Sequence, residues 1–112
     1  DIVSVHSPLN ERTRNLVGRE ELRTMKPSAI IINVARGGII NEAALAEALN
    51  EGWIAAAALD IFSVEPLRES PLCDVKDRYR LLASPHNAWS AAEAIDRLIG
   101  CVADNIRNFL NR

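Results

Sequence analysis

The chain has 112 residues, of which 48% are hydrophobic, and its formal net charge at pH 7 is −2. A chain of this length forms one domain at most and buries roughly two-thirds of its unfolded surface. Its balanced charge provides no basic surface for nucleic acid, and no apolar run approaches the roughly 20 residues of a membrane span, so we expect neither a nucleic-acid nor a membrane partner.

The first half of the chain alternates strands with helices. A β-branched run predicts a strand over 1–6, and apolar residues at roughly helical spacing predict a helix over 15–25. The run AIIINVA predicts a second strand over 29–35, which is apolar without alternation, as in a strand that is covered on both faces. Asn41 is a suitable N-cap for a helix over 42–51.

The second half continues this pattern, with strands expected over 54–62 and 80–86. The polar stretch over 63–79 contains two prolines and predicts a surface excursion. Ser90 and Glu93 suggest a capping box ahead of a long C-terminal helix, whose apolar face we expect to pack in the core. The stripe on that face consists of Ile95, Leu98, Ile99, Val102, Ile106 and Leu110.

Strands that alternate with helices predict an α/β fold with a parallel sheet and right-handed crossovers. In open parallel sheets, ligands bind outside the carboxyl ends of the strands. Arg36, Asp60 and His86 stand at or just after the expected strand ends, and Glu65 follows in a loop. The sequence therefore predicts that these four side chains gather on one rim.

A histidine that is paired with a carboxylate and lies beside an arginine is a coherent reaction site. Histidine exchanges protons near neutral pH, and a carboxylate bonded to one ring nitrogen fixes the tautomer. The planar fork of arginine suits a carboxylate or a 2-oxo acid. Gly37 and Gly38 would let the backbone approach a ligand closely. This combination fits a carbonyl that is protonated as it is reduced.

Taken singly, each residue also has a structural interpretation. Arg36 suits a surface ion pair, Glu65 a turn, and His86 a structural histidine with satisfied hydrogen bonds. His6, inside the first strand, is interpreted as structural. Asp60 differs, because an acid that closes an apolar run needs a partner.

Three motifs, INVARGG, AALDIFSVEP and SPHNAW, come in the order and at about the spacing of the D-isomer-specific 2-hydroxyacid dehydrogenases, and the chain resembles that family over essentially its whole length. The resemblance implies half of a Rossmann-type parallel sheet, with about four strands flanked by helices. It implies an NAD(P)-dependent oxidoreductase that interconverts a 2-oxo acid and a D-2-hydroxy acid. The glycerate dehydrogenase and hydroxypyruvate reductase branch is most similar, with glyoxylate or hydroxypyruvate as the expected substrate.

The resemblance also implies roles for the residues on the rim. Arg36 would bind the carboxylate and carbonyl oxygen of the substrate. His86 would protonate the carbonyl, with Glu65 as its paired carboxylate, and Asp60 would hold the nicotinamide carboxamide. The implied residues that line NAD or NADP are Ser7, Pro8, Val34, Ala35, Arg36, Asp60, His86, Asn87 and Ala88.

One alternative is a binding protein. Trp89 has a counterpart in the carboxy-terminal-binding-protein corepressors, which share the fold, bind NAD and act mainly as scaffolds. A dehydrogenase-like NAD-binding scaffold without significant catalysis therefore remains open. So do the phosphoglycerate and formate dehydrogenase branches.

The chain opens at Asp1 without an initiator methionine, which we interpret as an internal cut. The fingerprint Gly-x-Gly-x-x-Gly and the acid that reads the ribose are absent, so the sequence does not choose between NAD and NADP. We expect 1–112 to be the second mononucleotide half of a dinucleotide-binding domain, without the fingerprint half or a substrate domain.

An open sheet edge predicts a symmetric homodimer, and the missing phosphate loop predicts little catalysis by this chain alone.

The two cysteines, Cys73 and Cys101, lie far apart and lack the spacing of metal ligands. We expect reduced, structural thiols and no metal site. Reduced thiols favour a cytoplasmic location.

Overall fold

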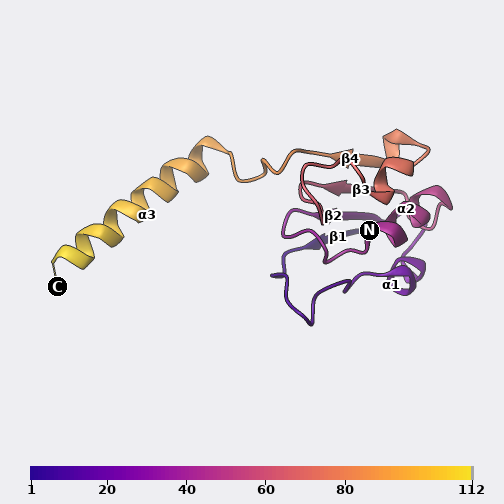
Figure 1. Cartoon of the computed structure of the whole chain (residues 1–112), viewed down its shortest axis with the longest axis horizontal. Coiled ribbons are helices and arrows are strands. Elements are labelled where there is room, and N and C mark those ends of the chain that lie inside the picture. Colours follow the sequence, from indigo (N-terminus) through magenta and orange to yellow (C-terminus); the bar gives the residue numbers. More distant parts are fainter. Residues whose placement is uncertain (112) are drawn as a thin grey trace.

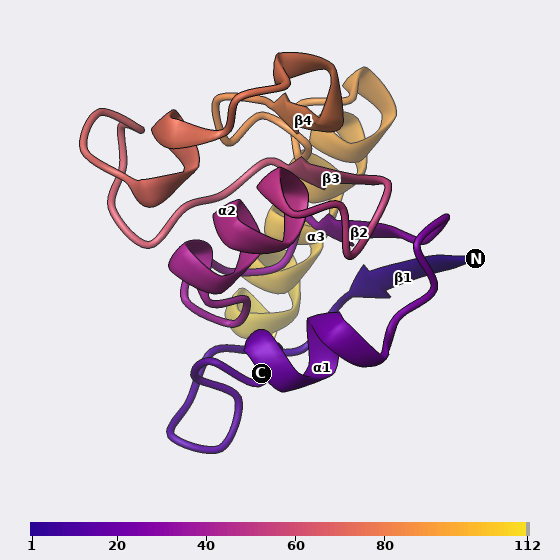
Figure 2. The ribbon, with the colours of Figure 1, turned by 90° about the vertical axis from the view of Figure 1, so that its right-hand side faces the viewer.

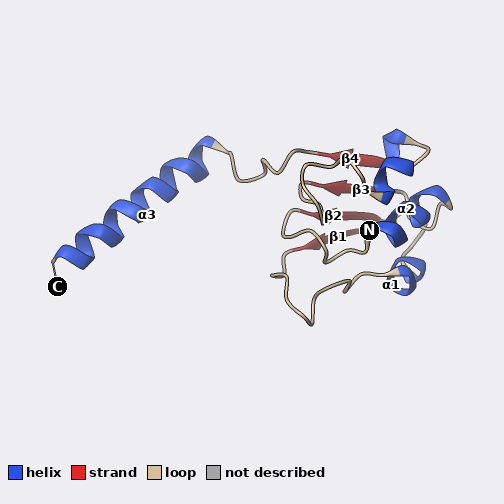
Figure 3. Ribbon diagram, viewed as in Figure 1, coloured by secondary structure: helices blue, strands red, loops and turns tan. Residues whose placement is uncertain are grey.

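The computed structural model describes residues 1–111, which form a four-stranded parallel sheet with helices in the connections (Figure 3). The strands pair in chain order: β1 (Ile2–Val5), β2 (Ile30–Asn33), β3 (Ala56–Leu59) and β4 (Leu81–Ala83). The helices are α1 (Arg19–Thr24), α2 (Glu42–Asn50), the short 3₁₀ helices η1 (Pro71–Asp74) and η2 (Arg78–Arg80), and α3 (Ala92–Leu110). The predicted α/β class and the number of strands are confirmed.

The hydrophobic core lies on one face of this sheet. Every second residue of β2 and β3 is buried, including Ile31 and Ala57, and these side chains form one cluster with Leu22 of α1 and with Leu45 and Leu49 of α2. The register pairs Ile31 with Ala57, so that small side chains on β3 leave room for the helices. The packing of β2 and β3 against these helices therefore fixes the position of the strand ends.

The N-terminus of α2 is capped as predicted. The side chain of Asn41 accepts a hydrogen bond from the N–H group of Ala44 at 2.9 Å. Gly52, just past the last turn, has φ +71°, a conformation that glycine adopts without a steric penalty.

The opposite face of the sheet is covered by no element of residues 1–111. Ile30 and Ile32 of β2 are only half-buried, and Leu82 of β4 is 69% exposed. Right-handed crossovers that move across a sheet in one direction place all their helices on the same face. The expectation that β2 is covered on both faces is therefore wrong for this chain.

The long helix α3 leaves the sheet and projects away from it (Figure 1). In the view along this direction, α3 lies behind the sheet (Figure 2). Its stripe is largely exposed, with Leu98, Ile99 and Ile106 each more than half accessible. The radius of gyration is 17.2 Å, against about 13 Å for a compact domain of this length. The prediction that this helix packs in the core is wrong within the described residues. No helix of residues 1–111 is long and apolar enough to cross a membrane.

Local hydrogen bonds also move two predicted boundaries. The helix expected over 15–25 is only α1, because the preceding turn is held by Asn10 and Thr13 side chains and Val17 forms a parallel bridge with Ile40. The predicted capping box does not form: Ala91 is the N-cap of α3. Ser90 instead donates its hydroxyl hydrogen to the carbonyl oxygen of Asn87.

The polar stretch over 63–79 is only partly the surface excursion that was predicted. Most of its residues are exposed, but Leu72 and Val75 are buried in the core cluster. These two side chains anchor η1 against α2, so the stretch is a packed connection.

Candidate functional site

Arg36 follows β2 in a turn that is held by a buried amide. Asn33 is 2% exposed; its side chain accepts a hydrogen bond from the Ala35 N–H at 3.0 Å and donates one to the Arg36 carbonyl at 2.9 Å. These bonds end the strand before its predicted limit and direct Arg36 to the surface. The Arg36 guanidinium donates to the Ala35 carbonyl at 2.7 Å, and within residues 1–111 it forms no ion pair.

Gly37 lies against backbone and not against an open ligand space. A Cβ atom added at Gly37 would lie 2.0 Å from the carbonyl oxygen of Phe62 and 2.7 Å from the nitrogen of Ser63. The close approach that Gly37 allows within residues 1–111 is between the turn after β2 and the turn after β3. Gly38 has φ +81°, which the turn requires.

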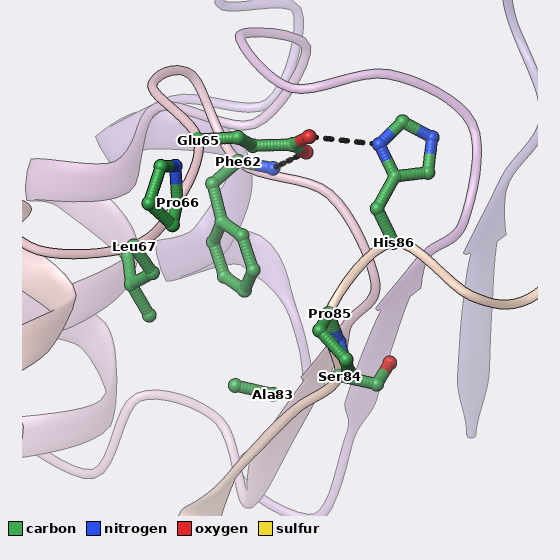
Figure 4. Close-up of a pocket in the computed structure, with 8 residues that line it drawn as sticks. All are labelled: Phe62, Glu65, Pro66, Leu67, Ala83, Ser84, Pro85 and His86. Carbon is green, nitrogen blue, oxygen red and sulfur yellow. Dashed lines mark hydrogen bonds and ion pairs between the residues drawn. The ribbon is translucent and has the colours of Figure 1, made fainter.

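His86 and Glu65 form a hydrogen-bonded pair, although they are 21 residues apart (Figure 4). The Nδ1 atom of His86 lies 2.8 Å from Oε2 of Glu65, and Oε1 of Glu65 accepts the Phe62 N–H at 3.0 Å. The pair brings the loop after β3 to the loop after β4. With Glu65 ionised, Nδ1 carries the hydrogen, so Nε2 is the ring nitrogen that is available for proton exchange.

The surroundings of Glu65 favour its ionised form. The hydrogen bond from His86 is the largest influence, the Phe62 N–H adds to it, and together they outweigh partial desolvation and lower the pKa of Glu65. Glu65 is therefore an acceptor for His86 throughout the neutral pH range.

Asp60 organises the loop after β4. It is 4% exposed, and its Oδ1 accepts the Ser84 hydroxyl at 2.6 Å and the Asn87 N–H at 2.9 Å, while Oδ2 accepts the Ala88 N–H at 2.8 Å. The backbone carbonyl of Asp60 also accepts the N–H of His86 at 2.8 Å. This answers why an acid closes an apolar strand: it fixes the segment that carries the histidine.

Burial is the largest single influence on Asp60 and by itself would raise the pKa of its carboxyl group. The hydrogen bonds from Ser84, Ala88 and Asn87, together with the nearby His86, outweigh burial and lower the pKa. Asp60 is thus ionised at neutral pH.

This arrangement predicts how Asp60→Asn changes stability. The amide oxygen can replace one carboxylate oxygen as an acceptor, but the amide N–H₂ group then faces the Ala88 N–H. Two donors meet at a buried position, so we expect the free energy of unfolding at pH 7 to fall by about 1–3 kcal/mol. Because the folded pKa lies below the unfolded value of about 3.9, the carboxylate stabilises the fold above about pH 4, and that contribution is lost as the pH falls through the folded pKa. Urea unfolding at pH 7 and pH 3 measures both effects.

The exposed Asp96→Asn on α3 is the matched control and is expected to change neither value. A stability difference between wild type and Asp60→Asn that stays constant from pH 7 to pH 3 would contradict the role given to the carboxylate.

Most of the predicted site residues line two cavities on the rim. Glu65 and His86 line a cavity of about 590 Å³. Arg36 lines another of about 760 Å³, whose walls come from the ends of β1 and β2: His6, Ser7, Pro8, Leu9, Val34, Ala35 and Arg36. The structure thus pairs Glu65 with His86 and joins Arg36 to the predicted cofactor residues of the first two strands, but records no contact between Arg36 and the pair. Within residues 1–111, no group of three His, Cys, Asp or Glu side chains is suited to hold a metal ion.

The residues around Asp60 fit the nicotinamide end of the expected cofactor. A carboxylate has about four acceptor positions, and the three donors above leave one, on Oδ2, without a donor among residues 1–111. Asp60 borders a small hollow of about 180 Å³ on the uncovered sheet face, with mainly apolar neighbours that include Ile32, Val34 and Leu82. An apolar wall beside a carboxylate acceptor suits a flat ring that carries an amide.

Sequence reasoning missed Asn33 and Ser84. An asparagine in the otherwise apolar run AIIINVA is a detectable signal, because a buried amide needs partners. Ser84 carries no such signal, since its role depends on the approach of Asp60 from the neighbouring strand.

Residues 1–88 match the family model of the D-isomer specific 2-hydroxyacid dehydrogenase, NAD binding domain. The chain is 42% identical over 111 residues to a glycerate dehydrogenase of Methylorubrum extorquens, covering 98% of this chain and 35% of the relative. It is 44% identical over 110 residues to a glyoxylate reductase of Aeropyrum pernix, covering 97% and 32%. The chain thus spans about a third of the length of these relatives.

Solved structures agree with the fold. A D-isomer specific 2-hydroxyacid dehydrogenase from Lactobacillus delbrueckii ssp. bulgaricus, in an NAD-complexed form, superposes with a TM-score of 0.80 at 31% identity, covering 95% of this chain and 36% of that chain. An acyclic imino acid reductase in complex with NADPH and D-Arg gives a TM-score of 0.85 at 31% identity, covering 99% and 34%.

The matched model is that of an NAD-binding domain, so the predicted nicotinamide dinucleotide cofactor is confirmed for the family, as is the predicted family itself. The structure adds a parallel sheet whose carboxyl-end rim carries Arg36, Asp60 and the Glu65–His86 pair. The chain belongs to the NAD-binding domain family of the D-isomer specific 2-hydroxyacid dehydrogenases.

Proposed function

We propose that the chain is the second mononucleotide half of the cofactor domain of a longer NAD(P)-dependent oxidoreductase, which interconverts a 2-oxo acid and a D-2-hydroxy acid. The observation that carries this proposal is the 2.8 Å hydrogen bond between Glu65 and His86 on the ligand-binding rim of the sheet. Membership of the dehydrogenase family supports the reaction class. Glyoxylate or hydroxypyruvate is the proposed substrate, which the names of the two relatives support.

In this proposal, His86 supplies the proton. Glu65 holds Nδ1, so that Nε2 gives a proton to the carbonyl oxygen of the 2-oxo acid during reduction and takes it back during oxidation. The bound cofactor supplies or accepts the hydride. Asp60 keeps His86 in place through the backbone of its loop.

The cofactor would lie across the strand ends. Asp60 would accept the carboxamide hydrogen at its remaining position on Oδ2, with the ring against Val34 and the uncovered sheet face. The other residues proposed to line NAD or NADP are Ser7, Pro8, Ala35, Arg36, His86, Asn87 and Ala88.

Arg36 is proposed to bind the substrate carboxylate and carbonyl oxygen through its guanidinium fork. We expect Arg36→Ala to raise KM for the 2-oxo acid at least about tenfold and to lower kcat as well, because a charge-assisted hydrogen bond contributes roughly 1.5–3 kcal/mol. Arg12→Ala, an exposed arginine in the turn before α1, is the matched control. An unchanged KM in Arg36→Ala would contradict the assignment.

The function is tested with the complete protein, a panel of 2-oxo acids and either NADH or NADPH. Oxidation of the reduced cofactor that depends on glyoxylate or hydroxypyruvate, with the D-hydroxy acid as product, is the expected result. Tight NADH binding without reduction of any 2-oxo acid would instead favour the NAD-binding scaffold.

Two further predictions remain part of the proposal. A homodimer of the isolated chain is supported by the unpaired edge of β1 and by the exposed apolar stripe of α3. A cytoplasmic location is supported by the free cysteines, Cys73 and Cys101, which form no disulfide.

A further inference from the structure

Glu42, the first residue of α2, is half-buried and reaches the loop that carries Glu65. Its Oε1 accepts a hydrogen bond from the N–H of Ser63 at 2.6 Å, and its Oε2 accepts one from the hydroxyl of Ser70 at 2.6 Å. These serines stand at the two ends of residues 63–70, which we call the Glu65 loop. One carboxylate therefore closes this loop at both ends.

The Glu65 loop has little packing of its own to hold it. Val64 is 73% exposed, Pro66 and Arg68 are also exposed, and only Leu67 packs against the core cluster as a half-buried side chain. Polar contacts from outside the loop must therefore determine where Glu65 points.

The contact with Ser63 acts directly on the geometry of the pair. The adjacent N–H groups of Phe62 and Ser63 are each bound by a carboxylate: Phe62 by Oε1 of Glu65, and Ser63 by Glu42. The orientation of this turn sets where the second oxygen of Glu65 lies, and that oxygen is the one 2.8 Å from His86.

A glutamate at the start of a helix also has a simpler explanation, because a negative charge there interacts favourably with the helix dipole. That effect requires no particular contact. It does not account for two short hydrogen bonds to positions 21 and 28 residues further along the chain.

We propose that Glu42 is a positioning residue that holds the Glu65 loop so that Glu65 fixes the Nδ1–H tautomer of His86. The consequence for catalysis rests on the proposed function, whereas the consequence for the tautomer rests on the geometry alone.

The experiment compares Glu42→Ala and Glu42→Gln by ¹⁵N NMR of the His86 ring and ¹³C titration of the Glu65 carboxyl group. In wild type we expect the Nδ1–H tautomer and a lowered pKa of Glu65. Glu42→Ala should lose the tautomer preference and raise the pKa of Glu65 towards its ordinary value. Glu42→Gln should restore both, because its amide accepts from the Ser63 N–H and donates to the Ser70 hydroxyl.

Two further variants separate positioning from general loss of stability. Asn41→Ala removes the cap of the same helix and leaves the Glu65 loop untouched, so it should lower the melting temperature and keep the tautomer. Ser70→Ala removes one of the two contacts and should give an intermediate result. A wild-type tautomer and a wild-type titration of Glu65 in Glu42→Ala overturn the proposal.

Activity of the complete protein is the second readout. Glu42→Ala should lower kcat about tenfold with little change in KM, and Glu42→Gln should recover most of it. If wild type reduces no 2-oxo acid but the NMR changes occur, the proposed function fails and the positioning role stands. If wild type is active and Glu42→Ala changes neither the tautomer nor kcat, the positioning role fails and the function stands.

Discussion

Replacing His86 with alanine in the complete protein is expected to lower kcat/KM for 2-oxo acid reduction by about 10²–10⁴-fold, the usual contribution of a positioned acid or base. The physical reason is the loss of a ring whose position is set by two neighbours. The backbone N–H of His86 is bound to the Asp60 carbonyl, and the ring atom Nδ1 is bound to Glu65. Steady-state kinetics with NADH measure the loss, and fluorescence titration is expected to show that NADH still binds.

Glu65→Gln completes a double-mutant cycle with His86→Ala. If Glu65 acts only through His86, the double variant is no slower than His86→Ala alone, because the partner has nothing left to orient. Glu65→Gln alone should lose less activity, since an amide oxygen still accepts from Nδ1. Additive losses in the double variant would show that Glu65 contacts the ligand independently. Near-normal turnover of His86→Ala would falsify the acid–base assignment.

The rim itself was predictable because few topologies are available to alternating strands and helices. Once β1 to β4 are parallel, their carboxyl ends share one edge, so Arg36, Asp60 and His86 reach the same rim whatever the details of the loops. The cap at Asn41 was equally predictable, since it depends only on its own helix.

The hydrogen bonds within the rim were not predictable in the same way. Glu42 meets Ser63 and Ser70 only because the loop after β3 returns to the start of α2, and no pattern in the sequence marks that return. Ser90 fits a capping box by sequence, yet its hydroxyl is bound to the Asn87 carbonyl. A capping motif fails where another backbone group close by in the chain offers the same side chain a partner.

Helix α3 shows what the periodicity of apolar residues does not predict. An apolar stripe predicts that a helix buries one face, but not which surface covers it. The segment from His86 to Ala88 is bound to Asp60, so the loop leaves the rim at a fixed point, and α3 starts beyond it, away from the core. The stripe and the uncovered sheet face are therefore two apolar surfaces that no other part of residues 1–111 covers.

Gly37→Ala is expected to lower the free energy of unfolding by about 3 kcal/mol, the upper part of the usual range for overpacking. The added Cβ would lie 2.0 Å from the oxygen and 2.2 Å from the carbonyl carbon of Phe62, and these are backbone atoms that no change of rotamer can move away. Gly37 does not have a positive φ, so this cost is steric and not conformational. Urea unfolding, followed by the fluorescence of the half-buried Trp53, measures it.

Gly100→Ala is the matched control, because a Cβ atom added there meets no heavy atom within 4 Å. In the interior of α3 it should raise the stability of the helix by about 1 kcal/mol and leave the unfolding of the sheet unchanged. In Gly37→Ala, the backbone shift that relieves the clash with Phe62 also moves the Phe62 N–H, which is bound to Glu65. We therefore expect Gly37→Ala to raise the pKa of Glu65, and wild-type stability together with an unchanged titration would show that the two turns do not meet as the structure has them.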